Sequence, residues 1–399
     1  MMTKISDRLA NLEESATLAM AAKAREFKEK GINVISLSLG EPDFKTPKHI
    51  QEGAKAAIDE GKYFAYPPVN GYLDLRQAIA DKFKRENGLE YGPNDIVVSN
   101  GAKQSIANVM YSLVNPGDEV IIFSPYWVSY SAIVQLAEGK AVYVKGGIES
   151  DFKVTGAQLK EAITDKTKVI IFSSPCNPTG AVFTQDELED IAAVLREHEG
   201  IYVISDEIYE HINYTGGHVS FGSLPGMFDR TITVNGFAKG FAMTGWRVGY
   251  IGAPTWIAKA CNKMQGQITS ANSGISQRAA LTALTSDLGP TKEMAAEYLR
   301  RRDMVFELLK SIEGFKVNLP TGAFYFFPDI SAYFGKSFGD TVINNASDFA
   351  MYILEDAHVS VVTGQAFGDP NCIRLSYAAS EEDLHEAISR IKKSLDKLS

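Results

Sequence analysis

The sequence predicts an α/β fold with a mostly parallel sheet flanked by helices. Short apolar runs recur through the middle of the chain, helical patterns separate them, and several runs are apolar throughout instead of alternating. Continuous apolar strands are typical of parallel sheets, because crossover helices bury both faces of the sheet. The expected strands are residues 96–98, 119–123, 169–172, 202–204, 231–234 and 248–251.

Two of the intervening helices carry recognisable start signals. Thr184 and Glu187 have the spacing of a capping box, which would open the helix between strands 169–172 and 202–204. Thr46 and Pro47 are typical of a cap and a first helical position. The apolar face of the helix that follows them is expected on Ile50, Ala54, Ala57 and Ile58.

The pattern changes near residue 291. A long charged helix is expected over 294–312, short strands at 323–327 and 372–376, and a last amphipathic helix over 381–398. Because no flexible linker separates the two patterns, both parts share one continuous chain. We predict a large domain at 47–290 and a smaller α+β domain made of 1–46 and 291–399.

Composition favours small-molecule chemistry. The chain of 399 residues has a formal net charge of −9, which argues against a nucleic-acid partner because phosphate contacts need a basic surface. No signal peptide or membrane-spanning run is apparent, so we expect a cytoplasmic protein with no membrane partner. Its three cysteines and six histidines lack the spacing of a disulfide framework or a metal site.

The first candidate site residue is Lys239. It follows the strand at 231–234 among small residues, and active sites in parallel sheets lie beyond the carboxyl ends of the strands. Arg247, eight residues later, would favour the neutral and nucleophilic form of the lysine amine. The alternative is an ordinary solvated lysine, which is the commoner case for this residue type.

A turn that could hold an anion follows another strand. Gly101, Ala102 and Lys103 leave the strand at 96–98 and open a helix. The free N–H groups and the dipole of that helix would suit a dianionic phosphate, with Arg247 as its charged clamp. The alternatives are a turn that binds nothing and a structural ion pair for Arg247.

Two further strand ends carry side chains suited to a heteroaromatic ring. Asp206 follows the strand at 202–204 and would keep a ring nitrogen protonated by charge pairing, while Tyr209 and Asn177 could contact a phenolic oxygen on that ring. The alternative for Asp206 is a helix N-cap. The loop at 173–180, which carries Asn177, would otherwise be a rigid turn.

Trp127 and Arg374 complete the set. Trp127 could stack flat on the ring, although core packing is the alternative. Arg374 lies in an apolar strand and so needs an anionic partner, either the carboxylate of a substrate or an internal salt bridge.

Taken together, these segments resemble the pyridoxal-phosphate-dependent aminotransferases of class I and II over nearly the whole chain. The matching motifs are Asn177-Pro178-Thr179-Gly180, Asp206-Glu207-Ile208-Tyr209, Lys239 through Gly245-Trp246-Arg247, and Arg374-Leu375-Ser376. The segments Leu39-Gly40-Glu41-Pro42-Asp43-Phe44 and Pro125-Tyr126-Trp127-Val128-Ser129-Tyr130 are most similar to the bacterial aspartate aminotransferase branch.

The resemblance implies a fold-type-I homodimer with shared active sites, in which amino acids and 2-oxo acids exchange an amino group by a ping-pong reaction. It implies that Lys239 holds pyridoxal 5′-phosphate as an aldimine, that Asp206 pairs with the pyridine nitrogen, and that Arg374 binds the α-carboxylate. The other roles that it implies are contacts to the cofactor by Gly101, Ala102, Lys103, Trp127, Asn177, Tyr209, Arg247 and, across the dimer, Tyr66, and contacts to the substrate by Gly40, Trp127, Asn177, Ser15 and Thr17.

Some positions depart from the pattern of the relatives. Gly236 and Ala238 stand where many relatives carry serines, so one hydroxyl contact to the phosphate is missing, and Lys103 or a water would substitute. Residues 267–276 hold no clear equivalent of the arginine that binds the distal carboxylate in some aspartate aminotransferases. The motif Ser15-Ala16-Thr17, together with Lys103, is therefore our candidate for that role.

The preferred substrate is aspartate. Relatives that also accept prephenate tend to carry a lysine just ahead of the serine motif, where this chain has Glu13 and Glu14. The alternatives are an aminotransferase of other donors (aromatic amino acids, alanine or prephenate), a lyase of the same fold, and a non-catalytic ligand sensor.

Overall fold

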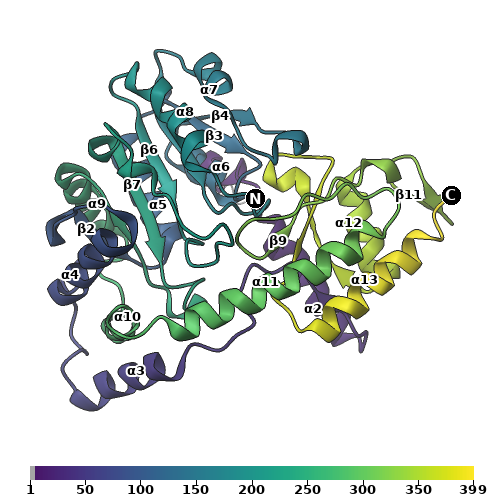
Figure 1. The fold of residues 1–399 in the computed structure, drawn as a ribbon, viewed down its shortest axis with the longest axis horizontal. Helices are drawn as coiled ribbons and strands as arrows, with labels where there is room; N and C mark the ends of the chain where they lie inside the picture. Colours follow the sequence, from purple (N-terminus) through teal and green to yellow (C-terminus); the bar gives the residue numbers. More distant parts are fainter. Residues whose placement is uncertain (1–4) are drawn as a thin grey trace.

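A seven-stranded sheet forms the centre of the computed structural model, which describes residues 5–399 (Figure 1). Strands β3, β4, β5, β6 and β7 are mutually parallel, and β8 lies antiparallel between β7 and β2, so the predicted mostly parallel sheet is confirmed. In spatial order the strands are β2 (Ile96–Ser99), β8 (Gly249–Gly252), β7 (Thr231–Gly236), β6 (Tyr202–Asp206), β5 (Thr167–Ser173), β3 (Glu119–Ser124) and β4 (Lys140–Lys145).

Strand β4, at the edge of the sheet beside β3, is absent from the strands expected from the sequence. Its residues are mostly exposed or half-buried, so they form no continuous apolar run. An edge strand contacts only one neighbouring strand and needs less apolar surface than a central one.

Helices cover both faces of the sheet because successive side chains along each strand point in opposite directions. Ile171 packs into a core with α5 (Ala102–Leu113), α6 (Ser129–Leu136) and α9 (Thr255–Ile268). Its neighbour Ile170 packs into the opposite core with α7 (Gly156–Ala162) and α8 (Gln185–Arg196). The predicted capping box of α8 is confirmed, since the Thr184 hydroxyl accepts a hydrogen bond from Glu187 N.

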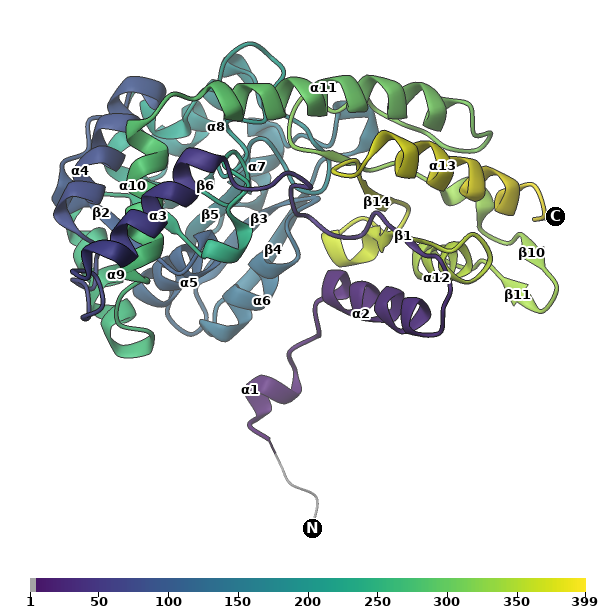
Figure 2. The ribbon, with the colours of Figure 1, turned by 90° about the horizontal axis from the view of Figure 1, so that it is seen from below.

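Two expectations for helix α3 (Lys48–Glu60) are wrong. Thr46 does not cap it: Pro47 is the N-cap, and the Thr46 hydroxyl donates to Ala242 O at 2.7 Å instead. Ile58 is 51% exposed, whereas Ile50, Ala54 and Ala57 are buried. Helix α3 packs against α10 (Gly274–Thr285), which also contacts α4 (Leu73–Lys82) (Figure 2), and the buried side chains of α3 do not include Ile58.

A separate apolar core lies beside the part of the chain that holds the seven-stranded sheet. The long helix α11 (Gly289–Lys310) runs alongside both parts and joins them (Figure 1 and Figure 2). The second part contains a three-stranded antiparallel sheet and two larger helices, and helix α2 packs against it. The elements are α2 (Ala16–Glu29), β1 (Ile35–Ser36), β9 (Tyr325–Phe326), β10 (Ser337–Phe338), β11 (Thr341–Val342), α12 (Ala346–Asp356), β12 (Val359–Ser360), β13 (Val362–Thr363), β14 (Ile373–Ser376) and α13 (Glu381–Leu395).

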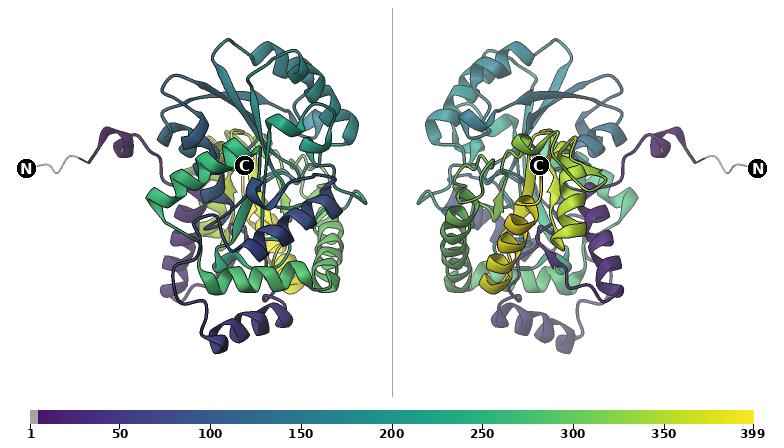
Figure 3. Two further views of the ribbon diagram at one scale, coloured as in Figure 1. Left: turned by 90° about the vertical axis from the view of Figure 1, so that its left-hand side faces the viewer. Right: turned by 90° about the vertical axis from the view of Figure 1, so that its right-hand side faces the viewer.

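The predicted helices at the end of the chain correspond to α11 and α13, and the predicted strands to β9 and β14. The division at residues 47 and 290 stays a prediction. The short helix α1 (Asp7–Ala10) has no buried residue and projects from one side of the molecule (Figure 3), where Arg8 pairs with Glu138 at 2.6 Å. Within residues 5–399, no helix combines the length and apolarity needed to cross a membrane.

Candidate functional site

A cavity of about 380 Å³ lies beyond the carboxyl ends of β5, β6 and β7. It brings together residues from both parts of the chain, as expected where parallel strands end at one edge of a sheet. Of the predicted site residues, its lining includes Ser15, Thr17, Gly40, Ala102, Lys103, Trp127, Asn177, Asp206, Tyr209, Lys239, Arg247 and Arg374. Gly101 adjoins Ala102 at the wall, whereas Tyr66 is 93% exposed and does not line the cavity.

Lys239 is half-buried in this cavity, and its ammonium donates a hydrogen bond to Gly40 O. Gly40 can approach because it lacks a side chain: a Cβ at this position would collide with the Tyr325 hydroxyl. Burial lowers the pKa of Lys239 from 10.5 to about 8; the positive charges of Arg374 and Arg247 add to the effect, and Glu41 opposes it. The neutral, nucleophilic form of this amine is therefore accessible near neutral pH.

This pKa predicts the pH dependence of the amine in the cofactor-free protein. Because only the deprotonated amine attacks a carbonyl, we expect the rate of reductive labelling of Lys239 by a small aldehyde to rise with a midpoint near pH 8. Mass spectrometry of the labelled peptides measures the rate. The exposed Lys48, read in the same spectra, reports the pH dependence of the reagent itself. A midpoint above pH 10 at Lys239 would show that the cavity does not perturb its amine.

Asp206 lies at the base of the cavity and is 4% exposed. Tyr130 donates to Asp206 Oδ2 at 2.6 Å, and Ile208 N donates to Oδ1 at 3.3 Å. Burial raises the pKa of Asp206 to about 6, although both hydrogen bonds oppose the rise. The alternative of a helix N-cap is excluded because the residues that follow Asp206 at the end of β6 form turns and no helix. A cationic ring nitrogen beside this carboxylate would hold it ionised.

Arg374 is the least expected charge in the site, because it is only 2% exposed. Its Nη1 donates to Asn177 Oδ1 at 2.9 Å and its Nη2 to Ser38 O at 2.6 Å, and its Nε is buried without a partner. Within residues 5–399, no carboxylate lies within 4.0 Å of this guanidinium, so the internal salt bridge considered from the sequence does not form. A buried cation lacking an anion is a ready site for a carboxylate.

The two hydroxyls of Tyr209 and Tyr325 lie 2.6 Å apart beside Arg374. Tyr209 is 3% exposed, and burial raises its pKa well above the ordinary value. Both phenols are therefore protonated at neutral pH, and since one donates to the other, one O–H remains to donate to an oxygen in the cavity.

The opposite end of the cavity suits a phosphate. Ala102 and Lys103 are the first two residues of α5, whose first N–H groups have no partner inside the helix. Gly101 adopts a φ of +83°, and a Cβ there would collide with the Arg247 guanidinium. Arg247 is held by its Nη1, which donates to Thr244 O at 2.9 Å.

Trp127 lines the cavity between these two ends. Its ring meets Tyr130 edge to face at 5.5 Å, and the Lys103 ammonium lies 5.1 Å from the Trp127 ring centroid. Burial lowers the pKa of Lys103, and the charge of Arg247 adds to this. The indole thus lines the cavity in contact with both Tyr130 and Lys103.

Among the cavity residues that have no role in the predictions made from the sequence are Tyr130, Tyr325 and Glu41. Tyr130 could have been found, since it comes three residues after Trp127, in the first turn of α6, and its N–H donates to Trp127 O at 2.9 Å. Tyr325 left no local signal, because its partner Tyr209 is 116 residues away in the chain.

Comparisons with known proteins agree with this geometry. A family model described as aminotransferase class I and II matches residues 32–391. The chain is 47% identical to the bifunctional aspartate aminotransferase and glutamate/aspartate-prephenate aminotransferase of Petunia hybrida, over 98% of this chain and 82% of the relative. It is 44% identical to the aspartate/prephenate aminotransferase of Cereibacter sphaeroides, over 98% of each protein.

Solved structures give the same result. The aspartate aminotransferase from Rhizobium meliloti superposes with a TM-score of 0.96 at 42% identity, covering 99% of this chain and all of that one. The aspartate aminotransferase from Thermus thermophilus with maleate superposes with a TM-score of 0.92 at 42% identity, covering 98% of this chain and all of that one. The resemblance read from the sequence is confirmed: the chain belongs to the aminotransferases of class I and II, and it is a transaminase.

Proposed function

We propose that this transaminase binds pyridoxal 5′-phosphate and transfers the amino group of L-aspartate to 2-oxoglutarate in a ping-pong reaction. One observation carries the proposal: a single cavity holds an amine of lowered pKa, a buried carboxylate and a buried guanidinium that lacks an anion, namely Lys239, Asp206 and Arg374. These three groups match the aldehyde of the cofactor, its ring nitrogen and the substrate carboxylate respectively.

The residues present fit this cofactor. The start of α5 and Arg247 would hold the phosphate, where Gly101 leaves room that any Cβ would fill. Asp206 would hold the proton on the ring nitrogen, and Asn177 and Tyr209 would contact the phenolic oxygen. When bound, pyridoxal phosphate supplies the electron sink that makes the α-proton of an amino acid acidic.

The protein has two tasks in the reaction. Arg374 would bind the α-carboxylate and so orient the α-hydrogen toward Lys239 Nζ. That nitrogen, once released from the cofactor, would take the proton from the α-carbon of the substrate. It would then deliver a proton to the carbon of the cofactor that had been its aldehyde carbon. Asp206 would stay ionised throughout, because the ring nitrogen beside it carries a positive charge.

A homodimer is part of the proposal. Phe64, Tyr66 and Leu73 are 69%, 93% and 61% exposed, which is unusual for large apolar side chains so near one another in sequence. A second copy of the chain would cover this surface, and Tyr66 would reach the phosphate bound by that copy.

The preference for aspartate is proposed on Ser15, Thr17 and Lys103. All three line the cavity, and each can bond a second carboxylate. The proteins named above as aspartate aminotransferases support the same substrate.

Replacing Lys103 by methionine tests this assignment. Loss of a hydrogen bond to a charged group costs about 1.5–3 kcal/mol, so we expect kcat/KM for L-aspartate to fall roughly 10- to 100-fold. L-Alanine, which has no distal carboxylate, should be affected less than about 3-fold by the same reasoning. Initial rates with 2-oxoglutarate as acceptor measure both values, with the exposed Lys84→Met as control. Equal losses for both donors, accompanied by weaker cofactor binding, would assign Lys103 to the phosphate instead.

Prephenate is a second candidate acceptor, because several relatives are named aspartate/prephenate aminotransferases. Glu13 and Glu14, the acidic pair ahead of Ser15, are exposed and do not line the cavity. Comparing prephenate with 2-oxoglutarate as acceptor for aspartate distinguishes the two activities.

A further inference from the structure

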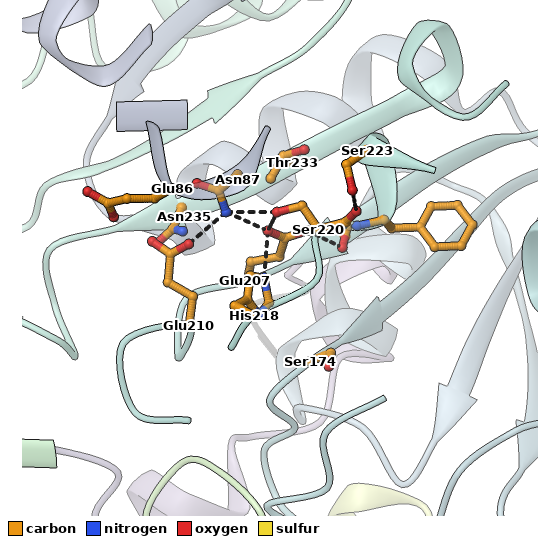
Figure 4. Close-up of polar contacts among 12 residues, drawn as sticks. Glu86, Asn87, Ser174, Glu207, Glu210, His218, Ser220, Ser223, Thr233 and Asn235 are labelled. Carbon is orange, nitrogen blue, oxygen red and sulfur yellow. Dashed lines mark hydrogen bonds and ion pairs between the residues drawn. The ribbon is translucent and has the colours of Figure 1, made fainter. Parts of the chain in front are cut away.

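A buried polar network adjoins the end of β6, and none of its residues lines the cavity (Figure 4). Asp206 and Tyr209 point into the cavity, whereas Glu207 and Glu210, each one residue further on, do not line it. Glu207 is 1% exposed and Glu210 7% exposed. Two buried carboxylates directly after two cavity residues need a physical explanation, since burying charge is costly unless it is compensated.

Glu207 is held by several donors. Its Oε2 accepts from Ser220 Oγ at 2.6 Å and from His218 Nε2 at 2.9 Å, and its Oε1 accepts from Ser205 Oγ at 2.9 Å. Phe221 N adds a weaker bond to Oε1 at 3.3 Å. These donors come from β6 and from the loop at 218–221, so the carboxylate fixes one segment against the other.

Glu210 is held from a third segment. The Lys82 ammonium contacts Glu210 Oε1, and Asn87 Nδ2 donates to Glu210 Oε2 at 2.8 Å. Asn87 joins the two carboxylates: its Oδ1 accepts from Lys82 at 2.7 Å, and its Nδ2 also donates to Ser220 Oγ at 2.7 Å, which in turn donates to Glu207. In each of these hydrogen bonds a donor faces an acceptor, and Figure 4 shows those among Asn87, Ser220, Glu207 and Glu210.

The charges in the network compensate one another. Burial raises the pKa of Glu210, but the positive charges of Lys82, His211 and His218 outweigh it and hold that pKa well below its usual range. Burial lowers the pKa of His218, but Glu207 outweighs it, and the net shift is upward. Lys82, which is fully buried, supplies a positive charge beside Glu210.

The network acts on a short piece of backbone. Glu207 N donates to Val234 O on the neighbouring strand at 2.9 Å, and Glu210 N donates to Glu207 O at 2.9 Å, so a tight turn over residues 207–210 follows directly on β6. In such a turn, displacing the Glu207 side chain also displaces the neighbouring Asp206, whose carboxylate meets Tyr130 at 2.6 Å. Small displacements of groups that contact a reacting centre have large effects on rate.

We propose that Glu207 and Glu210, with Asn87, Lys82, His218 and Ser220, are positioning residues that hold Asp206 and Tyr209 against the bound cofactor. The inference rests on the proposed function, because it assigns these groups to the support of a pyridoxal phosphate site. They act through Asp206 and Tyr209 and touch neither cofactor nor substrate.

Glu207→Gln tests the proposal in the holoenzyme. Both carboxylate oxygens of Glu207 accept hydrogen bonds, so the amide NH2 of glutamine would face donors in either orientation: Ser220 and His218 on one side, or Ser205 and Phe221 N on the other. The network is therefore disturbed while the side-chain volume is kept. We expect the dissociation constant of pyridoxal phosphate to rise by about tenfold or more, and kcat to fall while KM for aspartate changes little. The pH midpoint of the cofactor absorbance near 420 nm should also shift, which a purely structural residue would not cause.

The matched control is Glu119→Gln. Glu119 is also buried, and it accepts from Lys140 at 2.9 Å and from Thr164 at 2.7 Å. It is the first residue of β3, at the opposite end of the strands from the cavity. This variant should lose thermal stability and keep the cofactor affinity, absorbance midpoint and kcat of the wild type.

Ser220→Ala, which removes one hydroxyl, is a milder second variant that keeps the test open if Glu207→Gln does not fold. The proposal is overturned if both network variants, or Ser220→Ala alone in that case, match the control in cofactor affinity and absorbance midpoint. A wild-type protein that binds no pyridoxal phosphate would overturn the proposed function instead, so the two failures are distinguishable.

Discussion

Replacing Lys239 by alanine should abolish transamination while leaving the fold intact. The variant loses both the amine that carries the cofactor and the group that moves the α-proton, and proton transfer by a positioned side chain alone contributes up to about 10⁴-fold. The fold should persist because the only hydrogen bond that the Lys239 ammonium makes within residues 5–399 is to Gly40 O. Turnover with aspartate and 2-oxoglutarate, together with thermal unfolding of the cofactor-free protein, measures the two effects.

The same variant locates the cofactor. Borohydride reduction of the wild type, followed by peptide mapping, should place the pyridoxyl group on Lys239, and the alanine variant should carry none. Lys239→Arg is the matched control, since it keeps a positive charge in the cavity but cannot form the linkage. Appreciable turnover by the alanine variant without any added amine would contradict the role of Lys239 as the base.

Replacing Arg374 by leucine should have the second largest effect. Truncating one partner of a buried charge pair costs about 2–5 kcal/mol, so kcat/KM for aspartate should fall roughly 30- to 5000-fold. Stability should not fall with it, because this guanidinium is buried without a carboxylate partner in the described chain and leucine removes its desolvation cost. Steady-state kinetics and melting temperature separate these two quantities.

Arg374→Lys is the informative companion. Lysine keeps the charge but loses the planar fork that binds a carboxylate with two parallel bonds, so it should recover only part of the lost kcat/KM. Cofactor absorbance should be unchanged in both variants. If the leucine variant unfolds at a lower temperature and keeps its aspartate activity, Arg374 is a structural residue and the carboxylate assignment is wrong.

Much of the fold could be predicted from the sequence, because buried strands appear in it as continuous runs of apolar residues. The central strands β3, β5, β6 and β7 are buried and apolar, and the capping box at Thr184 and Glu187 is a contact between near neighbours. The edge strand β4 leaves no such pattern because only one side of it is paired. Thr46 had the residue type of a cap, but a distant carbonyl at Ala242 competed for its hydroxyl.

The sequence by itself determined the family, the sheet and the candidate residues at the strand ends, because parallel strands must deliver their carboxyl ends to one edge. Only the tertiary structure decided that Arg374 lacks an anion, that Tyr130 bonds Asp206, and that Lys82 reaches Glu210 across 128 residues of chain. These facts depend on which side chains meet after long loops close. Local sequence propensity does not predict such long-range contacts. Burial of the groups that make them shifts their pKa values and leaves charges without partners, and the chemistry depends on both.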